Sequence, residues 1–189
     1  MLDMTRIIGG IAGSLKLVPP AKSTRPTADR IRESIFNRLD ARGLIDGAKV
    51  LDLYAGTGAL GLEAISRGAA RLVMVEKDVK AAKVCQSNAA LLAKNDVGEM
   101  LVVNQPVQSF LASGSSRGVF DLVFIDPPYE ISNEEISKNL EGVLAIITDD
   151  SVIMVERSSR TGVPDWPNEL ALDDHKTFGD TSVFWLSRS

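Results

Sequence analysis

The stretch DLYAGTGALG, residues 52–61, places three glycines at the spacing G-x-G-x-x-G. This spacing is typical of the turn that joins the first strand of a nucleotide-binding α/β fold to the following helix. Glycines in that turn let backbone N–H groups and the helix N-terminus approach a ligand closely. Glu76 ends the next apolar run, 20 residues after Gly56, where a carboxylate can accept hydrogen bonds from ribose hydroxyls. The pattern predicts an adenosine-bearing ligand, and a nicotinamide dinucleotide and S-adenosylmethionine both fit it.

Around this turn the sequence alternates between strand and helix patterns. Most of the expected strands are apolar throughout, as in a parallel sheet covered on both faces. The last two extended runs meet at Gly179-Asp180 with no helix between them, which predicts an antiparallel hairpin. We therefore expect a doubly wound, Rossmann-like, mostly parallel seven-stranded sheet of the class I methyltransferase type. The expected strands are 49–54, 71–77, 100–105, 120–126, 151–158, 169–179 and 180–188, and the expected helices are 59–68, 78–95, 107–113 and 133–147.

Residues 1–42 form a basic extension in front of the expected methyltransferase domain, residues 43–189. The extension carries eight basic and four acidic side chains, whereas the rest of the chain has 13 basic and 21 acidic ones. We expect a β-hairpin over residues 5–20 and a helix over 27–43 that is capped by Thr27. A basic arm on an acidic body favours a polyanionic partner. A solvated, salt-bridged helix explains the same charges equally well.

The composition suits a globular protein of the cytoplasm. The chain has 189 residues, of which 44% are hydrophobic and 24% charged, enough for one domain with a sizeable core. No apolar run reaches the ~20 residues that span a bilayer, and the N-terminus lacks a signal-peptide pattern. The single cysteine, Cys85, lies on an apolar helix face and is expected in the core. The single histidine, His175, gives no basis for a His-rich metal site or a Ser-His-Asp triad, so we expect no metal.

The segment VFDLVFIDPPYE, residues 119–130, discriminates between the two cofactors. Its strand ends in Asp126, and Pro127-Pro128 impose an extended backbone at the edge where open α/β sheets bind ligands. The Asp126 carboxylate and the Pro127 carbonyl can accept both hydrogens of an exocyclic amine. Tyr129 can stack on the base, an interaction worth ~1–3 kcal/mol. This set favours methyl transfer to a base amine by alignment and electrostatics, although a strand exit stiffened by prolines is the structural alternative.

The segments TRIIGGIAGSLKL, RPTADRIRESIFN, DLYAGTGALGLEA, DPPY and FGDT together resemble the RsmD family of small-subunit rRNA guanine-N2 methyltransferases. The resemblance runs from about residue 5 to the end of the chain. It implies S-adenosylmethionine as cofactor, S-adenosylhomocysteine as product and the N2 amine of a 16S rRNA guanine as acceptor, of the guanine-966 type. The expected partner is 16S rRNA within the small ribosomal subunit or an assembly intermediate, and the protein is expected to be a monomer.

Site residues follow from the same resemblance. The catalytic tetrad that holds the guanine would be Asp126, Pro127, Pro128 and Tyr129. The cofactor-binding residues would be Asp52, Tyr54, Ala55, Gly56, Thr57, Gly58, Gly61, Glu76, Lys77, Gln105 and Asp126. The RNA-binding residues would be Arg6, Lys16, Arg25, Thr27 and Arg30.

One position departs from the family pattern. Members carry Asn or Asp after the third strand to accept from the adenine amine, and Pro106 stands there. Asn104, Gln105 or a backbone carbonyl would have to substitute. Glu156, which ends the fifth strand, is a further candidate for a guanine contact.

Other functions stay open on the sequence alone. DNA adenine and protein glutamine methyltransferases use the same type of tetrad, although this short chain lacks a separate target-recognition domain. A nicotinamide oxidoreductase would use the same glycine turn but would leave Asp126–Tyr129 without a task. A non-catalytic RNA-binding or assembly factor would keep the fold and the basic arm.

Overall fold

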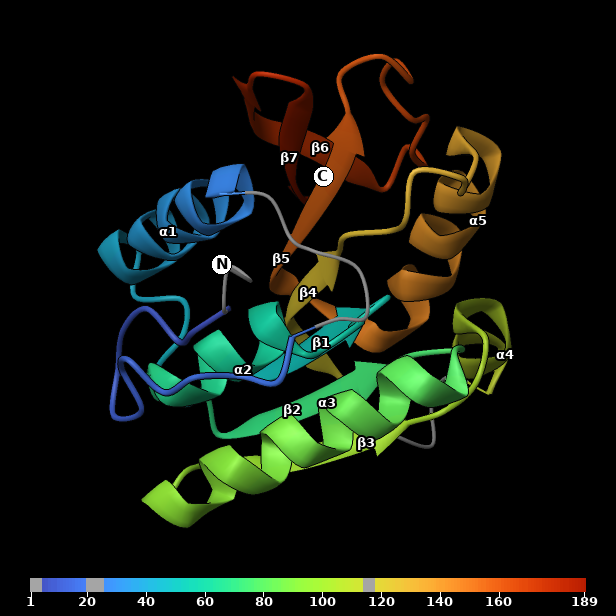
Figure 1. Ribbon diagram of the computed structural model, residues 1–189. Coiled ribbons are helices and arrows are strands. Elements are labelled where there is room, and N and C mark those ends of the chain that lie inside the picture. Colours follow the sequence, from blue (N-terminus) through green and yellow to red (C-terminus); the bar gives the residue numbers. More distant parts are fainter. Residues whose placement is uncertain (1–4, 20–25, 114–117) are drawn as a thin grey trace.

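A seven-stranded sheet in the order β3-β2-β1-β4-β5-β7-β6 runs through the computed structural model (Figure 1), which describes residues 5–19, 26–113 and 118–189. The strands are β1 (Lys49–Leu53), β2 (Arg71–Val75), β3 (Glu99–Val103), β4 (Phe120–Ile125), β5 (Ile147–Ser158), β6 (Leu170–Phe178) and β7 (Thr181–Arg188). The helices are α1 (Pro26–Ala41), α2 (Ala59–Ser66), α3 (Val79–Leu92), α4 (Val107–Ala112) and α5 (Asn133–Val143), with short 3-10 turns at Ala93–Asn95 and Leu144–Ile146.

The first five strands are parallel, and the chain reverses only at its end. β7 pairs antiparallel with both β5 and β6, so it is inserted between them. The turn that permits this reversal contains Gly179, whose φ of 59° lies in the left-handed region that glycine adopts without strain. The expected mostly parallel sheet with an antiparallel C-terminal hairpin is confirmed.

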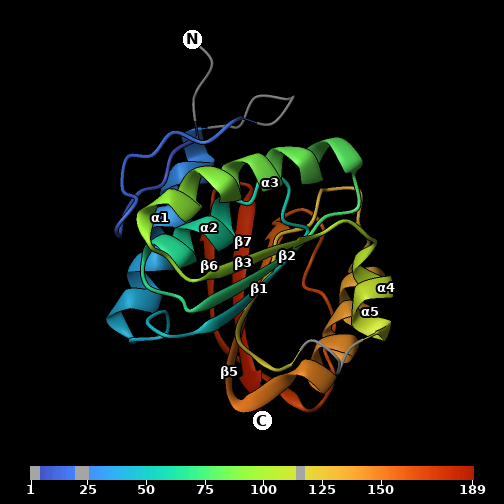
Figure 2. The same ribbon diagram turned by 90° about the horizontal axis from the view of Figure 1, so that it is seen from below.

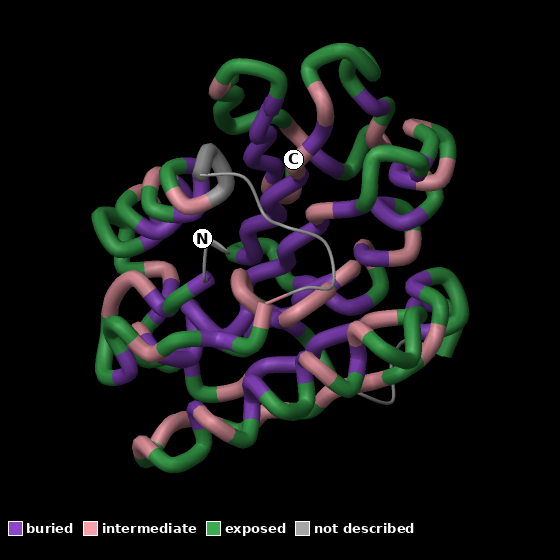
Figure 3. Tube along the Cα trace, in the orientation of Figure 1, coloured by how far each residue is buried: buried purple, intermediate pink, exposed green. Residues whose placement is uncertain are grey.

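Helices cover both faces of the sheet. α1, α2 and α3 lie on one face, and α4 and α5 on the other (Figures 1 and 2). The buried residues accordingly form two clusters, one on each side. On the first face, Phe36 of α1 packs edge-on against Phe124 of β4, with ring centroids 5.9 Å apart. The buried stretches therefore follow the central strands, while the outer helix faces are exposed (Figure 3).

The N-terminal segment forms the expected hairpin, although it is short and irregular. Its two arms pair antiparallel at the bridge between Arg6 and Lys16, and three backbone hydrogen bonds of 2.9 Å join them. The N–H groups of Ile8 and Gly9 donate outside the hairpin, to the carboxylate of Glu63 on α2, at 2.7 and 2.8 Å. A buried carboxylate of α2 therefore fixes the hairpin to that helix.

α1 begins at Pro26, one residue before the expected start. A proline suits the first helical position because its φ is already helical and it has no N–H to leave unpaired. Thr27 thus lies inside the helix rather than at its cap; its side chain and the whole of Arg25 lie outside the described residues. Near its other end the helix is fixed to the C-terminal hairpin, where Arg38 forms an ion pair with Asp174 and stacks over Trp185 at 5.0 Å.

Ile7, Leu17 and Phe36 belong to the same buried cluster as residues of β1, β2 and β4. The described part of residues 1–42 therefore shares one core with the sheet, and the boundary at residue 42 remains a prediction. Among the helices that the structure describes, none has the length and apolarity to cross a membrane.

Candidate active site

Three parallel strands, β2, β1 and β4, end at the same level and open one pocket beside β5, which continues to Ser158. Leu53 of β1, Val75 of β2, Ile125 of β4 and Val155 of β5 are in register. The next residue on each strand is Tyr54, Glu76, Asp126 and Glu156, respectively. All four line a cavity of about 520 Å³. The register alone thus brings three carboxylates and a phenol from distant parts of the sequence to one edge of the sheet, where open α/β folds bind ligands.

The glycine turn after β1 forms one wall of this cavity. Gly56 has a φ of 57°, and nothing lies within 4 Å of the place where its Cβ would stand, so the backbone is bare there. Gly58 also has a positive φ, but a Cβ on it would come within 2.9 Å of the Cys85 sulfur in the core. A Cβ on Gly61 would lie 2.7 Å from Leu72. Only Gly56 clears the way for a ligand; Gly58 and Gly61 allow α2 to pack on the sheet.

Glu76 and Asp52 support the turn from below. The Glu76 carboxylate accepts from the N–H of Gly56 and of Asp78, both at 2.8 Å, and each of its oxygens keeps a free lone pair for a ribose hydroxyl. Asp52 is buried and accepts from the Gly61 N–H at 2.9 Å, whereas its other oxygen has no partner in the described part of the chain. Burial raises the pKa of Asp52 to about 8, against the hydrogen bond from Gly61 that lowers it.

The tetrad Asp126-Pro127-Pro128-Tyr129 lines the same pocket. Pro127 is buried, whereas the Tyr129 ring is 67% exposed at the rim, open to a stacking partner. No described residue donates a hydrogen bond to the carboxylates of Asp126 or Glu156. Desolvation raises the pKa of both groups, and the negative charge of Asp126 raises that of Glu156 further. Two neighbouring acceptors without donors therefore face the pocket.

The matches to known proteins identify the chain. Residues 5–187 match the family model described as "Conserved hypothetical protein 95". The chain is 38% identical over 178 residues to "Ribosomal RNA small subunit methyltransferase D" of Escherichia coli K12, which covers 94% of this chain and 86% of that protein. It belongs to the RsmD family. The family comprises S-adenosylmethionine-dependent methyltransferases, so the expected family and the expected cofactor are confirmed.

Solved structures agree with this membership. The Escherichia coli protein yhhF superposes with a TM-score of 0.82 at 32% identity, over 98% of each chain. Magnesium protoporphyrin IX methyltransferase of Synechocystis PCC 6803, solved with bound S-adenosylmethionine, superposes with a TM-score of 0.68 over 86% of this chain and 80% of that one. At 17% identity the second likeness concerns the fold alone, and it confirms the class I methyltransferase architecture of this RsmD-family chain.

The structure brings most of the expected cofactor and guanine residues of this RsmD-family chain to the pocket. Gly58 and Gly61 lie behind the wall, and Lys77 and Gln105 are not part of it. The expected residues that line the pocket are Asp52, Tyr54, Ala55, Gly56, Thr57, Glu76, Asp126, Pro127, Pro128 and Tyr129.

The structure does not single out one of the candidates for the adenine contact. Asn104 donates its amide to the backbone oxygens of Glu76 and Lys77, at 2.8 and 3.1 Å, so its role is to join the ends of β2 and β3. Gln105 is partly buried, and its amide nitrogen has no partner among the described residues. Pro106 caps α4 without a side-chain hydrogen bond. The adenine contact of this RsmD-family member therefore stays a prediction.

Several pocket residues carry no local signal in the sequence. Arg32, only 6% exposed, donates to the Arg6 carbonyl at 2.7 Å and to Asp29, and so joins the N-terminal segment to α1 beside the pocket. Arg157, 4% exposed, extends away from Glu156 to the loop behind the tetrad. The lining residues not expected from the sequence are Thr5, Asp29, Arg32, Ile35, Ala59, Leu60, Arg157 and Ser158.

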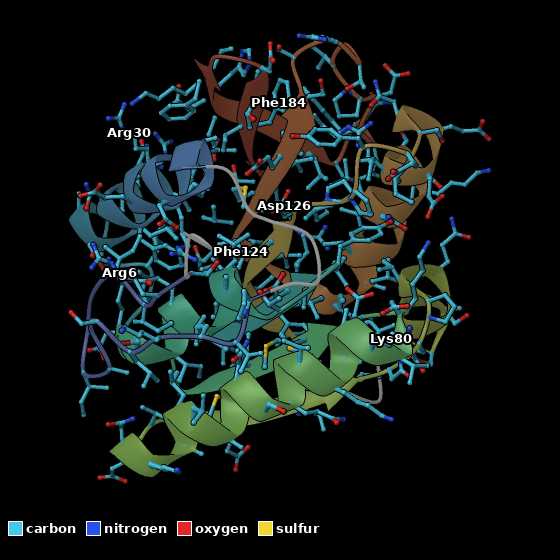
Figure 4. The ribbon with its side chains drawn as sticks, in the orientation of Figure 1. Arg6, Arg30, Lys80, Phe124, Asp126 and Phe184 are labelled. Carbon is cyan, nitrogen blue, oxygen red and sulfur yellow. The ribbon has the colours of Figure 1, made fainter. Side chains whose placement is uncertain are left out.

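The expected RNA-binding residues lie outside the pocket. Arg6, Lys16 and Arg30 are exposed. Figure 4 shows Arg6 on the N-terminal segment and Arg30 on α1, with Asp126 nearer the centre of the molecule. These residues can reach a large ligand that extends beyond the pocket, which is the arrangement expected for phosphate contacts. Within the described ranges, no group of three or more His, Cys, Asp or Glu side chains could hold a metal ion.

Proposed function

We propose that this protein transfers a methyl group from S-adenosylmethionine to the N2 amine of a guanine in small-subunit rRNA, of the guanine-966 type. One observation carries the proposal: the Asp126 tetrad lines the same pocket as the glycine turn, with an exposed ring and a carboxylate that no described residue bonds to. The name of the relative at 38% identity supports rRNA of the small subunit as the acceptor. The choice of guanine N2 rests on the resemblance and on the chemistry of the tetrad.

The pocket fits the cofactor. The bare backbone at Gly56 admits a close ligand, and Glu76, which is hydrogen-bonded to the turn, offers further lone pairs to ribose hydroxyls. The N-terminus of α2 follows the turn directly and favours a negatively charged group such as the methionine carboxylate. When bound, S-adenosylmethionine supplies an electrophilic methyl group on a sulfonium, which is its own leaving group.

The chain contributes alignment and acceptors. The lone pair of a base amine is delocalised into the ring, so the nitrogen must be oriented before it can attack. The Asp126 carboxylate and the Pro127 carbonyl accept its two hydrogens, and Tyr129 holds the ring plane by stacking. The positive charge that develops on the nitrogen is stabilised by the carboxylate. The surplus proton then leaves to Asp126 or to water.

The RNA-binding surface is part of the proposal. Arg6, Lys16 and Arg30 would contact phosphates, while the tetrad takes a single base that is rotated out of its stack. Extrusion costs least in a loop, so we place the target guanine in a loop of the small subunit or of an assembly intermediate. The protein would act as a monomer in the cytoplasm, where that rRNA is found.

The product nucleoside tests the proposal. Small-subunit rRNA from a strain that lacks the gene is incubated with the purified protein and labelled S-adenosylmethionine, then digested for mass spectrometry. We expect label in N2-methylguanosine alone. Label in N6-methyladenosine, or none in naked rRNA and assembled subunits alike, would overturn the assignment. Binding of NADH with no binding of S-adenosylmethionine would favour the oxidoreductase instead.

A further inference from the structure

Glu156 stands beside the tetrad on the adjacent strand. Ile125 and Val155 are in register on β4 and β5, so Asp126 and Glu156 follow at the same level. Neighbouring strands lie ~4.8 Å apart, so the two side chains can place their carboxylates next to each other in the pocket. Both side chains line the pocket. The Glu156 carboxylate therefore adds a second hydrogen-bond acceptor beside that of Asp126.

Neither carboxylate receives a hydrogen bond from a residue that the structure describes. Two arginines line the pocket in the part of the chain that the structure describes, and both donate elsewhere. Arg32 bonds to Arg6 and Asp29, and Arg157 to Ile131 and Asn133. The pKa of Glu156 is raised by desolvation and by the charge of Asp126, which is the behaviour of a buried acceptor that lacks a donor. The sulfonium of the cofactor, a cation bound in the same pocket, favours the ionised form of the pair.

The arrangement of acceptors selects among the bases. The edge of guanine presents three N–H groups side by side, two on N2 and one on N1. Adenine and cytosine also carry an amine, but the ring nitrogen beside it is an acceptor. A carboxylate next to the amine site would face a lone pair in those bases and a donor in guanine.

We propose that Glu156 accepts a hydrogen bond from the N1–H of the target guanine and so makes the pocket selective for guanine over adenine and cytosine. The inference rests on the proposed function, since it concerns the base held by the same tetrad. Asp126 and Pro127 bind the N2 amine, and Glu156 reads the adjoining ring position. A base with an acceptor at N1 is rejected because it leaves a buried carboxylate unpaired against a lone pair.

An atomic substitution in the RNA tests this contact. 2,6-Diaminopurine keeps the reactive 2-amine but carries an acceptor at N1. It is placed by splint ligation at the mapped target position of 16S rRNA, which is used naked and reconstituted into subunits. For the wild-type protein we expect kcat/KM to fall about 100-fold or more relative to guanine. Equal methylation of both bases would overturn the inference.

The variant Glu156→Gln supplies the second comparison. Its amide oxygen can still accept from guanine N1–H, and its NH₂ group can donate to N1 of 2,6-diaminopurine. We expect the preference for guanine to shrink to within about 10-fold, whereas Glu141→Gln, an exposed carboxylate on α5, leaves the preference unchanged. An unchanged preference in Glu156→Gln would overturn the inference.

The two failures are distinguishable. If the wild-type protein methylates no guanine in any of these RNAs, the proposed function fails. If it methylates guanine but Glu156 does not affect the choice of base, this inference alone fails. The wild-type comparison between the two bases decides the question even if Glu156→Gln does not fold.

Discussion

Asp126 is the residue on which the proposed chemistry depends most. Its carboxylate faces the pocket without a donor from any described residue, at the end of a strand whose register is fixed on both sides. A group positioned in this way needs no reorganisation when charge develops on the attacking nitrogen. The same lack of a partner makes it costly for stability, since burial raises its pKa and disfavours the ionised form.

Replacing Asp126 should therefore separate chemistry from cofactor binding. For Asp126→Ala we expect kcat for methyl transfer to fall about 10²–10³-fold, the range seen when one preorganised electrostatic partner is removed. The affinity for S-adenosylmethionine should fall by much less. Single-turnover assays and titration calorimetry measure the two quantities. Asp149→Ala, whose side chain is 97% exposed, is the matched control, and a loss confined to cofactor affinity would contradict the assigned role.

Asp52 should make stability depend on pH in a defined direction. Its pKa is about 8 in the folded protein and 3.8 in the absence of burial, so between these values the folded state binds the additional proton. The free energy of unfolding must then fall as the pH rises from about 4 to about 8. Urea unfolding across this pH range should show a smaller fall in the free energy of unfolding for Asp52→Asn than for the wild type. The fall that remains in the variant is due to Asp126 and Glu156. Equal slopes in the variant and the wild type would contradict the buried neutral carboxyl.

At the scale of elements, the loop after the tetrad is held by β5. The N–H of Ile131 donates to the Pro128 carbonyl at 3.1 Å, and Arg157 donates to the Ile131 carbonyl at 2.7 Å and to Asn133 at 3.1 Å. Arg157 alternates with Glu156 along the strand, so the two residues face opposite sides. One strand end thus supplies a pocket acceptor and the support of the neighbouring wall.

Arg157 is expected to act as a positioning residue. In Arg157→Lys the charge is kept but the two separate hydrogen bonds cannot both be made. We expect kcat to fall about 10-fold or more, because small displacements of an aligned group are costly, with the affinity for S-adenosylmethionine unchanged. Arg160→Lys, an exposed neighbour, should have no effect. A rise in KM at constant kcat would indicate that the loop binds RNA without aligning the base.

Local patterns explain which elements the sequence could predict. The cap of α3 is Asp78, which accepts from Ala81 three residues on, and the turn of the last hairpin needs only Gly179. The N-terminal hairpin is confirmed, but its attachment to α2 could not be predicted, because the donors of Ile8 and Gly9 bond to a carboxylate more than 50 residues away. No pattern within residues 5–20 reveals that contact.

In the pocket, too, local motifs could be predicted from the sequence, whereas contributions from distant segments could not. The glycine turn and the tetrad are contiguous motifs and could be read from the sequence. The contributions of Arg32 and Arg157 depend on which strand ends align and on where α1 packs. Gly58 was interpreted as making room for the ligand, yet the space it frees lies against Cys85 in the core. Sequence spacing predicts that a residue is small more readily than it predicts which neighbour requires it.

The basic arm gives a prediction for the whole molecule. If Arg30 on α1 contacts a phosphate, Arg30→Ala should weaken rRNA binding at every sequence tested and reduce the slope of log K against log salt by about 1. Filter binding at several salt concentrations measures this slope. Lys94→Ala, in the 3-10 turn that follows α3, is the control of equal charge. If the salt slope of Arg30→Ala equals that of the wild type, Arg30 makes no phosphate contact. The alternative interpretation of α1 as a solvated, salt-bridged helix would then hold.

The central claim, methylation of one guanine of small-subunit rRNA at N2, is tested most directly by mapping modified nucleosides in cells. Small-subunit rRNA from a strain without the gene is compared by mass spectrometry with rRNA from the same strain that expresses either the wild-type protein or Asp126→Ala. The account predicts that a single N2-methylguanine is lost in the deletion strain, is restored by the wild-type protein and is not restored by Asp126→Ala. Restoration by Asp126→Ala, or an rRNA methylation pattern that does not change on deletion, would contradict it.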